Sequence, residues 1–322
     1  MACYSITQKL SVEMEKKLSI AILLCSFNGN KYISRQIDSI VNQTEKNWTI
    51  FISDDGSTDN TLDILRMYQE QLGQERLVII NGPGKGFARN FISLLEKVGN
   101  EFDYFAFCDQ DDEWMPEKLA IAIKKLSEVD RGSPAVYCGR TSLVDENGNH
   151  LGESPLFEKK PSFKNALIQS IAGGNTMVLN QTAKKVVDKT PRDVEIISHD
   201  WWVYIIVTAV GGYIYYDPEP VIKYRQHTDN IVGSNLGWLA RLKRISGLLD
   251  GHFKRWIDLN LYALNKSDIV ITPENMKILN SFDCARKSGL FKRLYTFNNL
   301  KMYRQTYLGT LGLYVAILLK KL

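Results

Sequence analysis

The sequence predicts an α/β fold, in which a mostly parallel, Rossmann-like nucleotide-binding sheet is flanked by helices. Two observations support this prediction. Four short apolar runs alternate with segments whose apolar residues recur at helical spacing, which is the pattern of βαβ units. Each run also ends in a short polar or glycine-rich loop, so the loops should gather at one edge of the sheet. The four runs are residues 18–25, 48–52, 77–80 and 102–108.

The first run, Leu18 to Cys25, is continuously apolar apart from Ser19, as expected of a strand buried on both faces. The segments between the four strands read as helices because their apolar residues repeat every three or four positions. The positions that define these helices are Ile33, Ile37, Ile40 and Val41, then Leu62, Leu65, Tyr68 and Leu72, and then Phe91, Leu94, Leu95 and Val98.

The second half of the chain is less regular. Residues 135–138 and 213–216 read as strands, and residues 203–210 as a buried helix. Asn147-Gly148 is a strong hairpin turn signal. The glycine loop around Gly173 leads into another strand that ends at Leu179.

The composition is that of an ordinary soluble globular protein, with 44% hydrophobic and 24% charged residues among 322. The five cysteines include no C-x-x-C pair, which favours reduced thiols and a cytosolic location over a disulfide framework or a zinc site. Residues 1–17 are polar and mixed in charge, unlike a signal peptide. We expect them to be a disordered extension, with Met14 as a candidate native start.

Charge is distributed unevenly along the chain. Residues 235–322 contain 15 Lys and Arg against 5 Asp and Glu, whereas the remainder is net acidic. This stretch has a helical pattern of apolar residues and a net positive charge. That charge suits an anionic partner such as a membrane surface. Its last apolar run, Leu308 to Leu319, has 12 residues, too few to span a bilayer. It could lie on a membrane surface, or it could pack on the domain with its flanking lysines solvated.

Three carboxylates follow the fourth strand, at Asp109, Asp111 and Asp112. Clustered carboxylates repel one another, so they need a cation or hydrogen-bond donors to stay ionised together. Oxygen ligands of this kind suit Mg²⁺ or Mn²⁺ held together with substrate phosphates. The alternative is an acidic turn that precedes a helix starting near Pro116.

A second acidic motif, Asp54-Asp55-Gly56-Ser57, follows the second strand. A carboxylate here can accept the imide N–H of uracil or thymine and so select a pyrimidine base. The same residues also suit the N-cap of the helix that follows. The glycine-rich loop of residues 82–86 lacks the spacing and the Ser or Thr of a P-loop, which argues against ATP hydrolysis.

Taken together, the motifs resemble the family 2 glycosyltransferases of the GT-A fold, and are closest to bacterial rhamnosyltransferases of surface-polysaccharide assembly. The resemblance covers about residues 18–235 and implies a GT-A domain there, followed by a basic helical C-terminal extension at 236–322. The motifs that carry it are residues 25–29, 54–57, 88–90, 108–114, 173–176, 199–202 and 224–227.

The resemblance implies a nucleotide site and a metal site. Asp111 would bind Mn²⁺ or Mg²⁺ that bridges the donor diphosphate, and His227 would touch the same ion. Asp55 would bind the pyrimidine, and Asp109 would face the ribose or the waters on the metal. The remaining residues expected at the nucleotide are Ser26, Phe27, Asn28, Lys85 and Arg89.

The resemblance also places the catalytic base at Asp200, where it would take the proton of the acceptor hydroxyl. His199 stands where the family commonly has an acidic residue. A protonated His199 would favour the ionised form of Asp200, and a neutral one would orient it. The alternative is that Asp200 caps the helix at 203–210, with the two following tryptophans in the core. Residues expected near the donor or acceptor sugar are Gly174, Asn175, Trp201, Trp202 and Arg225.

The expected function is inverting, metal-dependent transfer of a sugar to a hydroxyl of a lipid-linked glycan at the inner face of the cell membrane. L-rhamnose from dTDP-L-rhamnose is the expected donor, a UDP-hexose is the alternative, and no nucleic acid partner is expected. A different class of function is a nucleotide-sugar-binding scaffold without turnover. The intact acidic cluster and Asp200 argue against that class.

Overall fold

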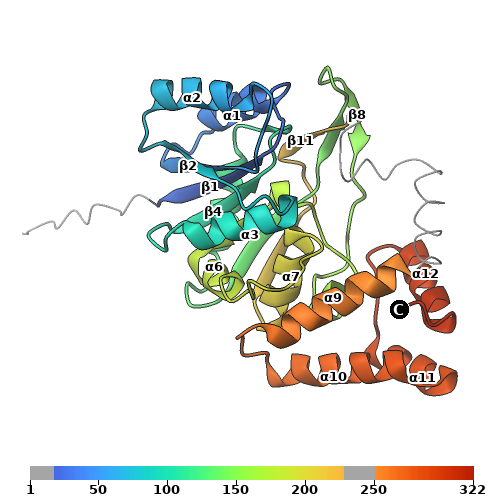
Figure 1. The fold of residues 1–322 in the computed structure, drawn as a ribbon. Helices are drawn as coiled ribbons and strands as arrows, with labels where there is room; N and C mark the ends of the chain where they lie inside the picture. Colours follow the sequence, from blue (N-terminus) through green and yellow to red (C-terminus); the bar gives the residue numbers. More distant parts are fainter. Residues whose placement is uncertain (1–17, 228–250) are drawn as a thin grey trace, which may run out of the picture.

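The computed structural model describes residues 18–227 and 251–322 (Figure 1). The expected N-terminal extension, the apolar residues between Trp238 and Leu249, and the expected domain boundary at residue 235 lie outside these ranges. Within them, the chain forms an α/β domain followed by a layer of C-terminal helices (Figure 1).

The described residues form a seven-stranded main sheet in the order β10-β6-β9-β4-β1-β2-β3. All neighbours are parallel except β9, which runs antiparallel to β4 and β6. The predicted parallel sheet is therefore confirmed, with one reversed strand in its middle. The strands are β1 (Ile20–Ser26), β2 (Trp48–Asp54), β3 (Leu77–Asn81), β4 (Tyr104–Cys108), β6 (Ala135–Gly139), β9 (Val178–Asn180) and β10 (Tyr213–Asp217).

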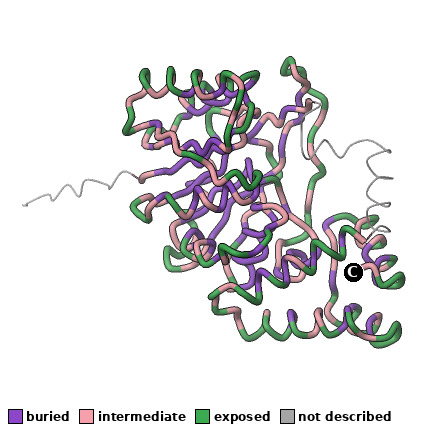
Figure 2. Tube along the Cα trace, viewed as in Figure 1, coloured by how far each residue is buried: buried purple, intermediate pink, exposed green. Residues whose placement is uncertain are grey.

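Both faces of this sheet are covered, as the uninterrupted apolar runs of β1 and β4 require. Alternate residues of β1 point into two separate cores: Leu23 packs with helix α3, and Ile22 packs with α1 and α4. Buried residues therefore run through the centre of the domain in Figure 2. The flanking elements are α1 (Ile33–Val41), α2 (Thr61–Leu72), α3 (Phe87–Lys97), α4 (Lys118–Ser127), α5 (Phe163–Ala166), η1 (Gly174–Thr176), α6 (Gln181–Val187) and α7 (His199–Ala209).

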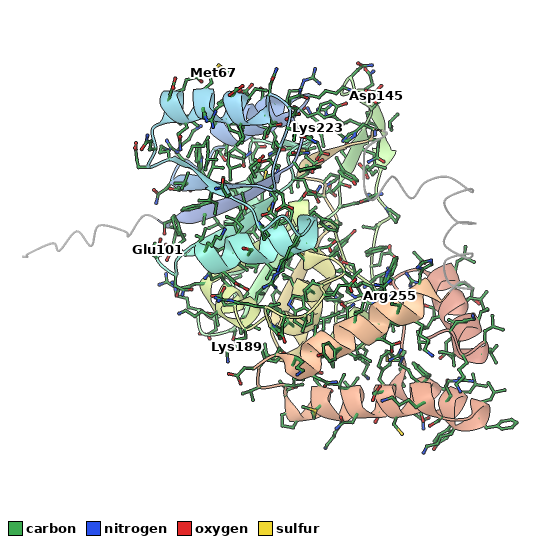
Figure 3. All side chains as sticks on the ribbon, in the orientation of Figure 1. Met67, Glu101, Asp145, Lys189, Lys223 and Arg255 are labelled. Carbon is green, nitrogen blue, oxygen red and sulfur yellow. The ribbon has the colours of Figure 1, made fainter. Side chains whose placement is uncertain are left out.

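A small four-stranded sheet stands beside the main one, in the order β5-β11-β7-β8. Asn147-Gly148 forms the predicted hairpin between β7 and β8, with Gly148 at a φ of 93° that glycine adopts without strain. Figure 3 shows Lys223 of β11 and Asp145 in this part of the molecule. The strands are β5 (Glu113–Trp114), β7 (Ser142–Val144), β8 (His150–Glu153) and β11 (Ile222–Arg225).

The C-terminal helices share a core with α7. Phe253 of α9 stacks on Trp201 with ring centroids 6.5 Å apart, and Phe282 and Phe297 belong to the same buried cluster. Asn275 of α10 donates hydrogen bonds to the last carbonyls of α7, at Thr208 and Ala209. None of the described helices is both long enough and apolar enough to cross a membrane. The helices are α9 (His252–Lys266), α10 (Pro273–Lys287), α11 (Leu290–Leu300) and α12 (Tyr307–Leu318).

This shared core predicts that the C-terminal helices unfold together with the α/β domain. Phe282 is fully buried and packs edge-on against Phe297. Phe282→Ala should therefore lower the free energy of unfolding by about 3–5 kcal/mol, measured by urea denaturation, in one cooperative transition. As a control, Phe291→Ala on the exposed side of α11 should change it by less than about 0.5 kcal/mol. Equal losses in the two variants, or a separate transition for the helices, would contradict the prediction.

Candidate active site

Several of the predicted site residues lie at the carboxyl edge of the main sheet. Ser26 at the end of β1 lies opposite Asp54 at the end of β2, and Leu24 lies opposite Cys108 at the end of β4. The loops that follow these parallel strands therefore start at one edge, the position where open α/β sheets bind ligands.

Asp54 organises the loop after β2. Its carboxylate accepts hydrogen bonds from the Ser26 hydroxyl at 2.7 Å, the Ser57 hydroxyl at 2.6 Å, and the backbone N–H groups of Gly56 and Ser57. Because the side chain is buried and its lone pairs are occupied, Asp54 fixes the turn instead of meeting a ligand. The Ser26 hydroxyl, which we expected to line the nucleotide pocket, is part of this arrangement.

Asp55, the expected pyrimidine ligand, anchors the glycine-rich loop of residues 82–86. Its two carboxylate oxygens accept from the N–H groups of Gly84 at 2.6 Å and Gly86 at 3.1 Å. Lys85 stands between these glycines with an exposed side chain. The structure thus brings Asp55 and Lys85 to one place, whereas the Arg89 guanidinium lies 3.8 Å from Glu96 and donates to the Pro191 carbonyl.

The loop after β1 is held from both sides. The Gln110 side chain accepts from the N–H of Phe27 and donates to its carbonyl, and the Asn28 side chain accepts from the N–H of Thr58. Asn28 has a φ of 49°, which asparagine tolerates. Phe27 is 56% exposed, so its ring is available to contact a ligand at this edge.

The three clustered carboxylates have different surroundings. Asp112 is fully buried, and its oxygens accept from the Asn175 amide at 2.5 Å and from the Arg225 backbone N–H at 3.3 Å. Burial raises the pKa of Asp109 to about 8, and the negative charges of Asp111 and Asp200 act in the same direction. Asp111 is partly exposed, and one of its oxygens lies 2.9 Å from Nε2 of His227.

Asp111 and His227 are therefore brought together, as expected of residues that share a metal ion. No group of three or more His, Cys, Asp or Glu side chains within residues 18–227 and 251–322 is arranged to hold a metal. One carboxylate and one imidazole nevertheless fit a divalent ion whose remaining ligands are substrate phosphate oxygens and waters. The pair is suited to Mn²⁺, because Mn²⁺ accepts imidazole more readily than Mg²⁺ does.

Arg225, expected near a sugar, lies inside the protein. Its guanidinium donates to the carbonyls of Asp111, Asp145 and Glu146 at 3.0–3.2 Å, which ties the acidic loop to the β7–β8 hairpin. The side chain is fully buried, so its visible role is to position Asp111 and the neighbouring His227.

Asp200 lies in the first turn of α7 and reaches the same edge. One of its oxygens accepts from the Trp201 N–H at 2.7 Å, as an acidic residue at a helix N-terminus does. Burial raises the pKa of Asp200 above its usual value, and hydrogen bonds from Ser198 and Trp201 oppose the shift. Asp200 also acts electrostatically on Asp109, so the expected base and the acidic cluster border one site.

His199 is enclosed by aromatic rings. Its imidazole stacks on Phe91 with centroids 4.0 Å apart and meets Phe107 of β4 edge-on at 5.0 Å. Neither ring nitrogen has a hydrogen-bond partner among the described residues, and burial lowers the pKa of His199 to about 3. His199 is therefore neutral near pH 7 and holds the start of α7 against β4 by packing. Gly174 allows this approach, since a Cβ there would overlap His199 Nε2.

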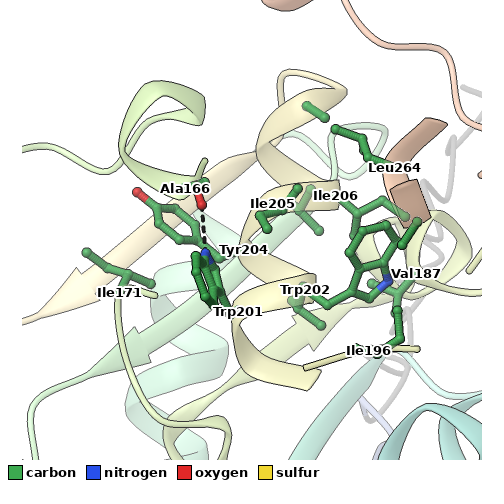
Figure 4. Packing of buried hydrophobic residues seen from close by; sticks show 14 of the residues in the cluster. Ala166, Ile171, Val187, Ile196, Trp201, Trp202, Tyr204, Ile205, Ile206 and Leu264 are labelled. Atoms are coloured by element: carbon green, nitrogen blue, oxygen red, sulfur yellow. Dashed lines mark hydrogen bonds between the residues drawn. The ribbon is translucent and has the colours of Figure 1, made fainter. Parts of the chain in front are cut away.

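Both tryptophans that were candidates for sugar stacking lie in the core (Figure 4). The Trp201 indole donates to the Ala166 carbonyl at 2.7 Å, and the Trp202 indole donates to the Thr190 hydroxyl at 2.7 Å. With both faces packed and both N–H groups satisfied, these rings show no surface for a sugar. Trp201 and Trp202 are thus core residues, which was the alternative to sugar stacking that the sequence left open.

Sequence reasoning missed Lys118. This lysine is fully buried in α4, and its ammonium lies 3.2 Å above the Trp114 ring without a hydrogen-bond partner among the described residues. Burial lowers its pKa to about 7, against the opposing effect of nearby acidic groups that include Asp112 and Asp109. In its protonated form Lys118 is a countercharge to these acidic groups. A single Lys at the start of an amphipathic helix gives no sequence signal for this role.

Comparison with known proteins identifies the family and the fold. A model of the family described as Glycosyl transferase family 2 matches residues 21–187. The chain is 32% identical over 239 residues to the dTDP-rhamnosyl transferase RfbG of Shigella flexneri, covering 69% of this chain and 78% of RfbG. Its fold resembles that of S. aureus TarS 1–349 in complex with UDP-GlcNAc, with a TM-score of 0.56, 16% identity, and coverage of 88% and 80%.

A further structural neighbour is the mannosyltransferase PcManGT from Pyrobaculum calidifontis in complex with GDP-Man and Mn²⁺. Its TM-score is 0.50 at 16% identity, and the match covers 95% of this chain and 88% of that protein. At 16% sequence identity, these two structures support the fold of the chain and not its substrate.

The buried, neutral His199 predicts a specific pH dependence of stability. Above pH 6.5 the residue is neutral in both states and contributes nothing. As the pH falls from 6.5 towards 3, the unfolded chain binds a proton that the folded chain does not, so stability declines by about 1.4 kcal/mol per pH unit. The difference in unfolding free energy between wild type and His199→Leu, from urea titrations, should change with this slope. His199→Gln should show the same slope relative to wild type despite its polar amide, and a parallel wild-type curve would refute the assignment.

Proposed function

The chain belongs to glycosyl transferase family 2 and has the GT-A fold, and we propose that it is a metal-dependent inverting transferase that moves L-rhamnose from dTDP-L-rhamnose to a lipid-linked glycan. The acceptor group would be a hydroxyl, at the inner face of the cell membrane. The observation that carries the proposal is the meeting of two features at one sheet edge. The Asp111–His227 pair lies beside β4, and α7 presents Asp200 to the same acidic cluster.

In this proposal Asp200 accepts the proton of the acceptor hydroxyl as the oxygen attacks the anomeric carbon from the face opposite the leaving group. Burial raises the pKa of the carboxyl above its usual value, which strengthens it as a base. The hydrogen bond from the Trp201 N–H fixes the orientation of one oxygen. His199 contributes by holding the start of α7 against Phe107.

At the other side of the reacting bond, Asp111 and His227 would hold the divalent cation, which offsets the charge that develops on the departing nucleoside diphosphate. Arg225 positions the Asp111 backbone through its carbonyl. Lys85, exposed on the loop that Asp55 anchors, would meet the diphosphate, and the exposed Phe27 ring lies at the same edge.

The donor sugar is inferred from the relative RfbG, which is a dTDP-rhamnosyl transferase. A UDP-hexose donor remains the alternative, because the structural neighbour TarS binds UDP-GlcNAc. Both nucleotides carry a pyrimidine base with an imide N–H. A hydrogen-bond acceptor such as the Asp55 carboxylate would therefore recognise either base. A non-catalytic scaffold is the less favoured class, since it would not require Asp200 beside the acidic cluster.

The base role of Asp200 is tested by Asp200→Asn. Removing the proton acceptor while keeping the shape should lower kcat about 10²–10⁴-fold, in an assay of transfer or of donor hydrolysis. Binding of dTDP, followed by thermal shift, should be unchanged. Asp193→Asn replaces an exposed carboxylate in the loop before α7 and should retain full activity. Full activity in Asp200→Asn would overturn the base assignment.

The metal and donor assignments are tested by binding. Nucleotide-induced stabilisation should require Mn²⁺ or Mg²⁺, should be lost with chelator, and should be larger for thymidine than for uridine diphosphate sugars. Asp111→Asn should weaken Mn²⁺ binding, followed by electron paramagnetic resonance with dTDP present. Asp63→Asn, at an exposed carboxylate of α2, is the matched control. Equal Mn²⁺ binding in both variants would remove Asp111 from the metal site, and a stronger response to UDP-hexoses would favour the alternative donor.

A further inference from the structure

The last helix, α12, is apolar on all sides, although one of its sides faces solvent. Leu313, Ala316 and Ile317 are buried against the rest of the chain. Leu308, Leu311, Val315 and Leu318 recur at helical spacing on the other side and are 40–68% exposed. A helix that is apolar on all sides is normally buried on all sides. In α12, however, the exposed stripe is not covered by any residue within 18–227 and 251–322.

Exposed aromatic side chains accompany the stripe. Tyr307 begins α12 and is 82% exposed, and Phe291 and Tyr295 of the neighbouring helix α11 are 87% and 70% exposed. Figure 2 shows that the outer parts of α11 and α12 are largely exposed. Aromatic side chains of this kind favour the boundary between water and the apolar part of a bilayer.

The charge around the stripe has one sign. Residues 288–322 contain six Lys and Arg and no Asp or Glu, and residues 305–319 contain no charge at all. Basic residues stand at both ends of the helix, Lys301 and Arg304 before it and Lys320 and Lys321 after it. An apolar stripe between basic ends is the arrangement of helices that lie in the interface of an anionic membrane.

Two other occupants fit less well. A two-fold dimer would place this patch against its own copy and so bring the basic ends of both helices together, which like-charge repulsion opposes. A membrane-spanning arrangement is excluded by length, since 12 residues make a helix of about 18 Å against a hydrocarbon core of about 30 Å.

We propose that the exposed stripe of α12, Leu308, Leu311, Val315 and Leu318, is the surface by which the protein docks on an anionic lipid bilayer. The inference rests on the proposed function, because a lipid-linked acceptor would be presented at such a surface. It goes further in naming the side chains that enter the bilayer interface and the lysines that meet the lipid headgroups.

The test is co-sedimentation of the full chain with vesicles. Wild type should bind vesicles of equimolar phosphatidylcholine and phosphatidylglycerol, and should bind pure phosphatidylcholine at least tenfold more weakly. Leu308→Gln/Leu311→Gln/Leu318→Gln should abolish binding. The control Met67→Gln/Leu151→Gln/Leu156→Gln changes three residues that are 42–54% exposed elsewhere, with Met67 on α2 (Figure 3), and should bind as wild type does.

Charge is tested separately with Lys320→Gln/Lys321→Gln. Each lysine near an anionic surface contributes about fivefold in affinity, so this variant should bind roughly tenfold or more weakly. Lys124→Gln/Lys189→Gln, two exposed lysines outside the C-terminal helices, should have no effect. Circular dichroism would verify that every variant keeps its helices.

Several outcomes would overturn the docking surface. These are wild type left in the supernatant with anionic vesicles, a triple α12 variant that sediments as wild type does, or a dimer in light scattering that the triple variant dissociates. Donor hydrolysis without vesicles separates this proposal from the proposed function. The α12 variants should keep that activity, and its absence in wild type that still binds vesicles would count against the proposed function alone.

Discussion

The structure of the site depends on how the chain holds several carboxyl groups within a few residues after β4. Like charges in a low-dielectric setting repel strongly, so they cannot all share one environment. The protein separates them. Asp112 points inward to the Asn175 amide and the Arg225 N–H, and the buried Lys118 supplies a countercharge nearby. Asp111 points outward to His227. Because Asp112 is satisfied by Asn175 and Arg225, the Asp111 carboxylate does not have to share its buried environment.

The same division of roles occurs after β2. Asp54 is buried and saturated by four hydrogen bonds, whereas Asp55 holds the loop that carries Lys85. In both motifs one of two adjacent carboxylates is buried and satisfied within the protein, whereas the other is only partly buried. Neither Asp54 nor Asp55 caps the following helix α2, whose N-cap is Asn60, and the ligand-binding role expected of Asp55 stays a prediction.

The strands and helices of the first half could be predicted from the sequence because each parallel strand is a continuous apolar run and each helix has one apolar face. The hairpin at Asn147-Gly148 was equally readable from its turn chemistry. The reversed direction of β9 was not, because a three-residue strand carries no signal of its partner's direction. β5 was missed for the same reason, since two residues show no periodicity. Among the site residues, the roles of Lys118 and Gln110 depend on contacts between segments far apart in sequence.

The position of the expected base connects the site to the C-terminal helices. The two ends of α7 are fixed by different parts of the chain: His199 packs against Phe91 and Phe107 at its start, and Asn275 of α10 binds the carbonyls at its end. Between these ends Trp201 packs against Phe253 of α9. Since α7 is a rigid helix of 11 residues, a shift of α9 or α10 would be passed to Asp200. The C-terminal helices therefore do more than extend the domain, because they help to set where Asp200, the proposed proton acceptor, stands relative to Asp109 and Asp111.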